Sequence, residues 1–109
     1  MYQGTTPALN LIVEGVDLTN KTVFVTIRCG TYAITKSGED LAVIFAEGNS
    51  TVIIRLTQQQ TLQMKEPTAT VQIRFVDAEG NADATNKAIF NVEESLYHAV
   101  IEYEDGDSE

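Results

Sequence analysis

Residues 56–85, LTQQQTLQMKEPTATVQIRFVDAEGNADAT, join a helix-capping signature, a strand and a glycine turn in one ordered block. Thr57 and Gln60 have the spacing of a capping box, in which the Thr57 hydroxyl accepts from the Gln60 backbone N–H and the Gln60 side chain returns to the Thr57 N–H. Residues 70–76 alternate between apolar and polar side chains, the period of a half-buried strand. Residues 77–81 contain the Asp, Gly and Asn of a turn. The block therefore predicts structural elements rather than a functional site, namely a short helical turn, a strand and a hairpin turn.

The same two-residue alternation recurs elsewhere in the chain, separated by clusters of turn formers. Further strands are predicted at residues 9–13, 21–29, 32–36, 41–46, 51–56 and 84–92. Residues 37–40 are Ser-Gly-Glu-Asp, a turn that predicts a hairpin between the two strands beside it. Apolar residues on both faces of residues 51–56 indicate a central strand. Residues 96–103 are either a closing strand or a short helix, and the β-branched pair Val100-Ile101 favours the strand.

Short strands in this number, with one helical turn, favour a two-sheet sandwich over a parallel α/β sheet. The sequence thus predicts an all-β fold: an Ig-like two-sheet antiparallel β-sandwich with one short helical turn. With 109 residues the chain has the length of one domain, which we expect to span residues 1–104. We expect residues 105–109 to be an acidic, solvated and disordered tail, and the alternative is an acidic docking peptide.

Charge and cysteine content exclude several classes of partner. Seven Lys and Arg against sixteen Asp and Glu give a net charge of −9, so the chain would repel the phosphate backbone of nucleic acid. The first ten residues carry no basic side chain and no long apolar run, so we expect neither a signal peptide nor a membrane span. Cys29 is the single cysteine and cannot form an internal disulfide, which fits a reducing cytoplasm. We therefore expect no nucleic-acid partner and no membrane partner.

One acidic turn has the outward look of a calcium loop. Oxygen-bearing side chains alternate around Gly80 at Asp77, Glu79, Asn81 and Asp83. The glycine stands at the fourth place rather than the sixth, and the twelfth place holds alanine instead of the bidentate glutamate. We therefore expect a solvated hairpin tip and no bound metal.

No set of residues in the sequence combines into a catalytic centre. Cys29 lies on the apolar phase of its strand and is expected to be a buried small hydrophobe rather than a nucleophile. His98 has no partner at metal-ligand spacing and is expected to be a partly exposed strand residue. The acidic pairs at residues 39–40 and 93–94 flank turns, where carboxylates are solvated. These observations predict a protein that is not an enzyme and needs no cofactor.

Two apolar residues fall on the polar phase of their strands and are candidates for a partner surface. They are Ile12 and Phe24. An outward apolar side chain belongs either to a contact with another protein or to local packing under a loop or the helical turn. The sequence leaves both alternatives open.

Several short motifs follow one another in order across the quoted block. They are Leu56-Thr57-Gln58, Thr61-Leu62, Val71-Gln72-Ile73-Arg74, Gly80 and Ala84-Thr85, with a looser extension upstream through Thr35-Lys36-Ser37-Gly38. Together they resemble the N-terminal domain of phage baseplate upper proteins and similar small prophage proteins of Gram-positive bacteria. The resemblance implies a non-enzymatic β-sandwich that attaches to other phage proteins.

The sequence departs from that family in one respect, since a trimerising stalk or receptor-binding module behind the domain is not expected for this chain. We therefore expect a tail, baseplate or head–tail adaptor or accessory component rather than a receptor-binding protein. Its expected partners are other phage structural proteins, with a homo-oligomer left open. Its expected location is the bacterial host cytoplasm and then the virion. The alternative is a cytosolic binding or regulatory protein of prophage origin.

Overall fold

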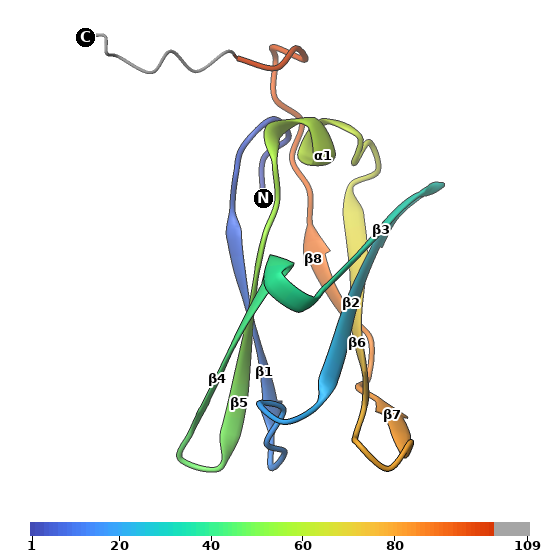
Figure 1. Ribbon diagram of the computed structural model, residues 1–109. Coiled ribbons are helices and arrows are strands. Elements are labelled where there is room, and N and C mark those ends of the chain that lie inside the picture. Colours follow the sequence, from blue (N-terminus) through green and yellow to red (C-terminus); the bar gives the residue numbers. More distant parts are fainter. Residues whose placement is uncertain (102–109) are drawn as a thin grey trace, which may run out of the picture.

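Two antiparallel sheets pack face to face in the computed structural model, which describes residues 1–101 (Figure 1). The smaller sheet has the strand order β1 (Ala8–Glu14), β5 (Asn49–Arg55), β4 (Leu41–Ala46). The larger sheet has the order β3 (Tyr32–Ser37), β2 (Thr22–Cys29), β6 (Thr68–Val76), with its far edge shared by β7 (Ala82–Ala84) and β8 (Ala88–Asn91). Two short helical segments lie between strands: the 3₁₀ turn η1 (Gly38–Asp40) and the helix α1 (Gln58–Leu62).

The chain changes sheet in the order of an immunoglobulin-like sandwich. It passes from β1 to β2, returns from β3 to β4 and crosses again from β5 to β6. Immunoglobulin-type sandwiches place strands B, E and D in one sheet and strands C′, C, F and G in the other. Here β1, β5 and β4 take the first set of places, and β3, β2, β6 and the β7–β8 edge take the second. The predicted all-β, Ig-like two-sheet sandwich is therefore confirmed.

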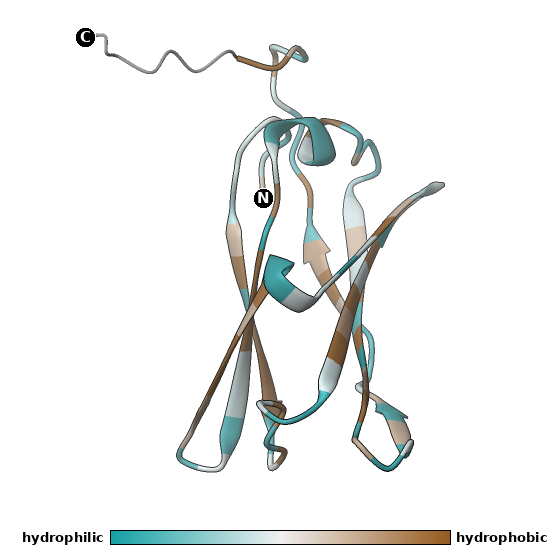
Figure 2. Ribbon diagram, viewed as in Figure 1, coloured by the Kyte–Doolittle hydropathy of each residue, from teal (hydrophilic) through white to brown (hydrophobic). Residues whose placement is uncertain are grey.

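The inward faces of the central strands supply most of the core. Alternate residues of β2 are buried over its whole length, as the sequence predicts. Val25 and Ile27 of β2 and Val52 and Ile54 of β5 are each 0% exposed and belong to one apolar cluster. Figure 2 shows brown stretches within both strands, in the second half of β5 and along the middle of β2. Full burial of such a side chain stabilises the fold by about 1.5–3 kcal/mol relative to exposure.

Ser50 is buried beside this cluster and fastens the connection between β1 and β2 to β5. Its hydroxyl donates to the carbonyl oxygen of Val16 at 2.6 Å and accepts from the N–H of Leu18 at 2.9 Å. A buried hydroxyl without partners would destabilise the fold by about 1–3 kcal/mol. With both bonds made, Leu18 enters the core from a connecting segment that is not itself a strand.

The helix α1 closes one end of the sandwich and begins with the predicted capping box. The Gln60 N–H donates to Thr57 Oγ1 at 3.1 Å, and the Thr57 N–H donates to Gln60 Oε1 at 2.9 Å. The buried Thr61 hydroxyl donates to the carbonyl oxygens of Thr5, at 2.9 Å, and Gln58, at 3.2 Å. A helix of five residues depends on such contacts, because its intrinsic propensity is too small to hold it.

The turn at residues 37–40 does not join a hairpin, so that prediction is wrong. β3 pairs with β2 and β4 pairs with β5, and η1 carries the chain from one sheet to the other. The hairpin lies one connection earlier, where Cys29 and Tyr32 close a two-residue loop in which Gly30 has a φ of +62°. Such tight loops match the twist of paired strands, so this loop makes β3 the antiparallel neighbour of β2.

The closing strand predicted over residues 96–103 is also wrong for its described part. The edge beyond β8 is occupied by the N-terminal segment, which makes a parallel bridge there. The backbone of Ile101 bonds instead to the side-chain amide of Gln58, through its N–H at 2.7 Å and its carbonyl oxygen at 3.0 Å. Alternating apolar and polar residues do not form a strand where no neighbouring strand has free backbone groups to pair with. Residues 102–109, with the acidic tail predicted at residues 105–109, lie outside the described residues.

The strand predicted at residues 84–92 is interrupted in the middle. The Thr85 N–H donates to the carbonyl oxygen of Ile73 at 2.8 Å, and the Thr85 hydroxyl accepts from the Ile73 N–H at 3.1 Å. The side chain thus takes the place of a backbone carbonyl in the ladder. The chain leaves the sheet at Asn86 and Lys87 and rejoins it as β8.

Replacing Thr57 with Ala is expected to lower the free energy of unfolding by about 0.5–2 kcal/mol, because the Gln60 N–H loses its acceptor. Thr57→Ser keeps the hydroxyl and is the matched control. Urea unfolding midpoints of the three proteins, compared at equal slope, measure the difference. An alanine variant with the wild-type midpoint would show that the cap does not stabilise the fold.

Candidate functional site

The two residues predicted to form a partner surface lie on opposite faces of the sandwich. Ile12 is on β1 of the smaller sheet and is 66% exposed, and Phe24 is on β2 of the larger sheet and is 41% exposed. Both point outward, as predicted. They do not form one surface, because the whole core lies between their sheets.

Strand register extends the surface around Ile12 into an apolar face of the smaller sheet. Ile12 stands opposite Thr51 of β5, and Thr51 stands opposite Ile44 of β4, which is 55% exposed. In the next row Ile53 stands between Ala42 of β4 and the polar Asn10 of β1. We call the five residues other than Asn10 the isoleucine face. The charged residues on this side of the sheet are Glu14 and Arg55, one at each end of the strands.

Sequence reasoning found Ile12 and the apolar residues on both faces of residues 51–56, but it missed Ile44. The signal for Ile44 was present, because residues 47 and 48 form a two-residue loop that sets β4 against β5 in one register. No local signal sets Ile12 beside Thr51. β1 and β5 are paired through about thirty-five intervening residues, and only the folded register brings their isoleucines into one face.

The surroundings of Phe24 are polar. Its cross-strand neighbours are Arg74 of β6 and Ser37 of β3. One row along, the hydroxyls of Thr26 and Thr35 lie 2.9 Å apart and bond to each other. Phe24 is thus a single aromatic ring on a hydroxyl-rich face, and the isoleucine face is the larger apolar candidate.

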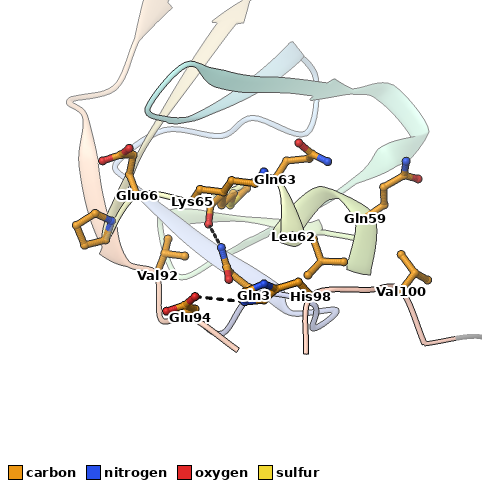
Figure 3. A pocket seen from close by; sticks show the side chains of 12 residues that line it. Gln3, Gln59, Leu62, Gln63, Lys65, Glu66, Val92, Glu94, His98 and Val100 are labelled. Carbon is orange, nitrogen blue, oxygen red and sulfur yellow. Dashed lines mark hydrogen bonds and ion pairs between the residues drawn. The ribbon is translucent and has the colours of Figure 1, made fainter. Parts of the chain in front are cut away.

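A groove of about 790 Å³ opens beside α1 (Figure 3). It is lined by Gln3, Gln59, Leu62, Gln63, Met64, Lys65, Glu66, Pro67, Val92, Glu94, His98 and Val100. The polar lining side chains include acids, bases and amides, and the groove lies against the segment that follows β8. This mixture could hold a small polar ligand or a peptide, and nothing in it fixes a reacting atom.

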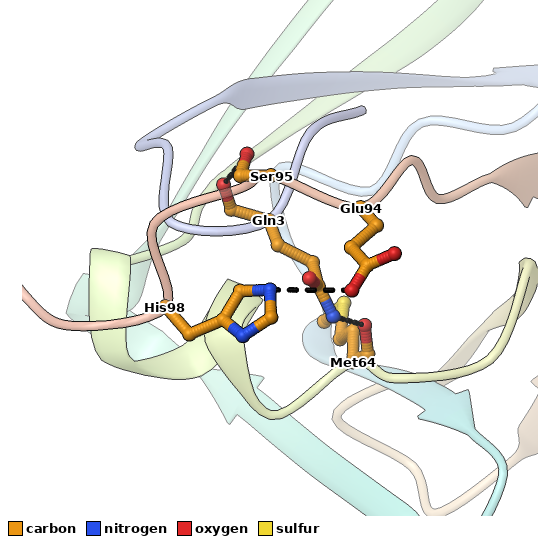
Figure 4. Close-up of polar contacts among 5 residues, drawn as sticks. All are labelled: Gln3, Met64, Glu94, Ser95 and His98. Atoms are coloured by element: carbon orange, nitrogen blue, oxygen red, sulfur yellow. Dashed lines mark hydrogen bonds and ion pairs between the residues drawn. The ribbon is translucent and has the colours of Figure 1, made fainter.

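Gln3 holds the floor of this groove together (Figure 4). The side-chain N–H of Gln3 donates to the backbone carbonyl oxygen of Met64 at 2.7 Å. The backbone carbonyl oxygen of Gln3 accepts from the Ser95 hydroxyl at 2.6 Å. His98 Nε2 lies 3.3 Å from Glu94 Oε2, and both side chains are mainly exposed. Gln3 therefore has a structural role, because it connects the segments that contain Met64 and Ser95. His98 lies in an irregular segment rather than in the strand that the sequence predicted.

Cys29 is buried on the inward face of β2, as predicted. Its thiol approaches the carbonyl oxygens of Glu66 and Thr68, each at 3.5 Å. A buried cysteine of this kind behaves as a small apolar side chain with a weak S–H donor. Packing thus accounts for Cys29.

The acidic turn after β6 uses its oxygens to hold its own backbone. Asp77 Oδ1 accepts from the N–H groups of Glu79 and Asn81, both at 2.9 Å, and Asp77 Oδ2 accepts from Asn81 Nδ2 at 3.2 Å. The hydrogen bond from the Asn81 backbone lowers the pKa of Asp77 below its ordinary value. Within residues 1–101, no group of three or more His, Cys, Asp or Glu side chains is placed to hold a metal ion.

Comparison with known proteins places the fold but no family. No family model matches the chain, and no curated protein matches its sequence. Solved structures that match include an uncharacterized protein of Listeria monocytogenes in complex with glucose, magnesium and calcium, and the cycloalternan-forming enzyme of the same organism with a pentasaccharide substrate. Each has a TM-score of 0.53 at 16% identity, covering 84% of this chain and 8% of the other.

These matches show a shared fold and nothing further. The chain spans less than a tenth of the length of each Listeria protein. Murine CRIg also matches, at a TM-score of 0.40 and 15% identity over 87% of this chain and 89% of that one. Among the described residues, no helix is long and apolar enough to cross a membrane.

Calcium is expected to leave the melting temperature unchanged, because both oxygens of Asp77 are already bonded within the turn. Differential scanning fluorimetry with millimolar calcium, with magnesium as the control ion, and with a chelator checks this. A rise of several degrees with calcium alone would show that residues 77–83 bind the ion.

Stability should also depend on the ionisation of Asp77. Its folded pKa is lowered by hydrogen bonds to its carboxylate, so the stabilisation is complete above the ordinary value of 3.8 and is lost as the pH falls through the folded pKa. Asp77→Asn keeps an acceptor oxygen without the charge. The wild type should exceed this variant in unfolding midpoint at pH 7, and the gap should close as the pH falls through the folded pKa of Asp77. A gap that is constant with pH would contradict the assignment.

Proposed function

We propose that the chain is a non-enzymatic structural component of a phage or prophage particle, in the tail, the baseplate or the head–tail junction. It works through contacts with other phage structural proteins. The observation that carries this proposal is the isoleucine face, where Ile12 and Ile44 are exposed in one cross-strand row with no charge between them. Contiguous exposed apolar surface is typical of a site that binds another protein.

The phage assignment is supported by the resemblance of residues 56–85 to phage baseplate upper proteins. These residues form α1, which closes one end of the sandwich, and β6 and β7, which are two strands of the larger sheet. The isoleucine face lies on the smaller sheet, so the shared scaffold would leave it free for a partner. The proposed location follows from the role: the host cytoplasm during synthesis and the virion after assembly.

The proposal includes no turnover. The nucleophile of highest intrinsic reactivity in the sequence is the Cys29 thiol, and it is buried against two carbonyl oxygens. His98, the single histidine, is exposed beside Glu94 in the lining of the groove, to which Cys29 does not belong. Binding through a surface, rather than a reaction, is what these side chains support.

A cytosolic binding or regulatory protein of prophage origin is the second candidate. The groove beside α1 favours it, because a hollow of about 790 Å³ with amide, acidic and basic side chains suits a small polar ligand. The two candidates use different parts of the molecule. Their genes would also have different neighbours, since a particle component is expected among portal, tail and capsid genes.

Particles induced from a strain that carries the gene test the proposal. Mass spectrometry of purified particles should detect the protein, and the Ile12→Asp variant should fold with an unchanged melting temperature yet be depleted from particles at least about tenfold, a loss of ~1.4 kcal/mol in binding. Ile89→Asp is the matched control, because Ile89 is 71% exposed on the larger sheet. If purified particles lack the wild-type protein, the result would favour the cytosolic binding or regulatory protein instead. Equal incorporation of both variants would exclude the isoleucine face.

A further inference from the structure

The open edge of the smaller sheet is a strand of six apolar residues. β4 reads LAVIFA, without a charge, a proline or a glycine, and β5 is the strand with which it pairs. Figure 1 shows β4 as the outermost strand of its sheet, and Figure 2 colours it brown. An edge strand presents a row of unpaired N–H and C=O groups, which is a template for another strand.

The other three edges of the sandwich carry the usual protection against such pairing. β1 ends in Glu14, β3 contains Lys36 and β7 contains Asp83, and charges on an edge strand discourage the addition of a further strand. β8 is protected by length, since it has four residues. Among the described strands, β4 is thus the long edge without protection.

The loop between β4 and β5 fixes which backbone groups of β4 are free. Glu47 and Gly48 form this two-residue loop with φ values of +53° and +82°, as a type I′ turn requires. Ala46 and Asn49 are paired on either side of it, and a turn of this type has its hydrogen bond between these two positions. Bonded and non-bonded positions alternate along antiparallel strands. Alternate residues of β4, counted back from Ala46, therefore direct their N–H and C=O groups to β5.

The remaining residues of β4 direct their backbone groups to the open edge. They are Val43 and Phe45, with Leu41 at the start of the strand. The Leu41 N–H is already used, because it donates to the carbonyl oxygen of Gly38. Val43 and Phe45 leave two donors and two acceptors, which is a self-complementary set.

We propose that β4 pairs antiparallel with β4 of a second copy, about a twofold axis through Ile44, so that the two smaller sheets become one sheet. Opposite residues of an antiparallel pair point to the same face, so outward residues must meet outward residues. With this axis, Ile44 meets the partner's Ile44 outside, and Val43 meets the partner's Phe45 inside. The N–H and C=O groups of Val43 and Phe45 in each copy then all bond across the axis. The pairing rests on the β4 edge alone, whether or not the chain belongs to a phage particle.

Charge favours this register over the one in which the twofold axis passes through Val43. An axis through Val43 would set Glu47 directly opposite the partner's Glu39, and like charges in opposed positions are destabilising. An axis through Ile44 sets Glu47 opposite the partner's Leu41. Acidic residues still flank both ends of the pair, and the net charge is −9, so added salt should strengthen the association by screening. Six residues a side is small beside the roughly 20–30 of a standard interface, so the dimer should depend on concentration.

Sedimentation velocity over a range of concentrations and salt tests the pairing. The wild type should pass from monomer to dimer, and Val43→Pro should remain monomeric, because proline removes an edge N–H without removing a bond to β5. Ala33→Pro is the matched control. Ala33 follows the loop-closing Tyr32 and so directs its N–H to the open edge of β3, and this variant should dimerise as the wild type does. Circular dichroism confirms that both variants are folded.

Cross-linking tests the register and keeps the proposal testable if Val43→Pro fails to fold. Ile44→Cys should form a disulfide dimer under mild oxidation, because residues opposite each other in a non-bonded pair have Cα atoms about 4.5 Å apart. Ala42→Cys should not, because its copies would lie four residues, about 13 Å, apart. A wild type that is monomeric at every concentration and salt, a folded Val43→Pro variant that still dimerises, or an Ala42→Cys disulfide without an Ile44→Cys disulfide would each overturn the proposal. Loss of the dimer together with normal incorporation into particles would leave the proposed phage role standing.

Discussion

The contact between the inward faces of β2 and β5 is the interaction on which the other elements depend. Val25, Ile27, Val52 and Ile54 are fully buried there, and these two strands are inner members of their sheets. The edge strands β1 and β4 pair with β5, and β3 pairs with β2. β6 also pairs with β2 and in turn holds β7 and β8. Because side chains alternate along a strand, fixing the inward residues also fixes the outward ones. The exposed isoleucines are thus a direct consequence of how the core is built.

Sequence periodicity predicted which residues face inward, and it failed where the pairing partner was distant. The alternation of β2 and the capping box of Thr57 are local, and both were predicted correctly. The hairpin at residues 37–40 and the strand over residues 96–103 were wrong, because each required a choice of partner. β3 had already been paired through the loop at Gly30, and the edge beyond β8 was occupied by the N-terminal segment. Periodicity carries no information about either competitor.

The candidate site likewise has a part that was predictable from local sequence and a part that was not. Ile12 and Phe24 were predicted to point outward from the phase of their own strands, and both do. Their grouping was beyond reach, because it depends on register across strands that are far apart in the sequence. Ile12 gains Ile44 as a neighbour through β5, whereas Phe24 gains Arg74 and a hydroxyl-rich face. Two residues of the same apparent kind therefore have different surroundings, and only one of them belongs to an apolar surface.

The isoleucine face and the edge of β4 meet at Ile44, which belongs to both. A twofold axis perpendicular to the sheet at this residue would bring the two isoleucine faces onto one side, so that a further partner would contact a platform built from two copies. The two surfaces are energetically distinct, since backbone hydrogen bonds join the edges and apolar burial covers the face. Substitution at Ile12 should therefore separate them, because Ile12 lies two strands away from the axis. Ile12→Asp is expected to keep the salt-dependent dimer while losing the particle contact, and loss of both together would mean that face and edge form one interface.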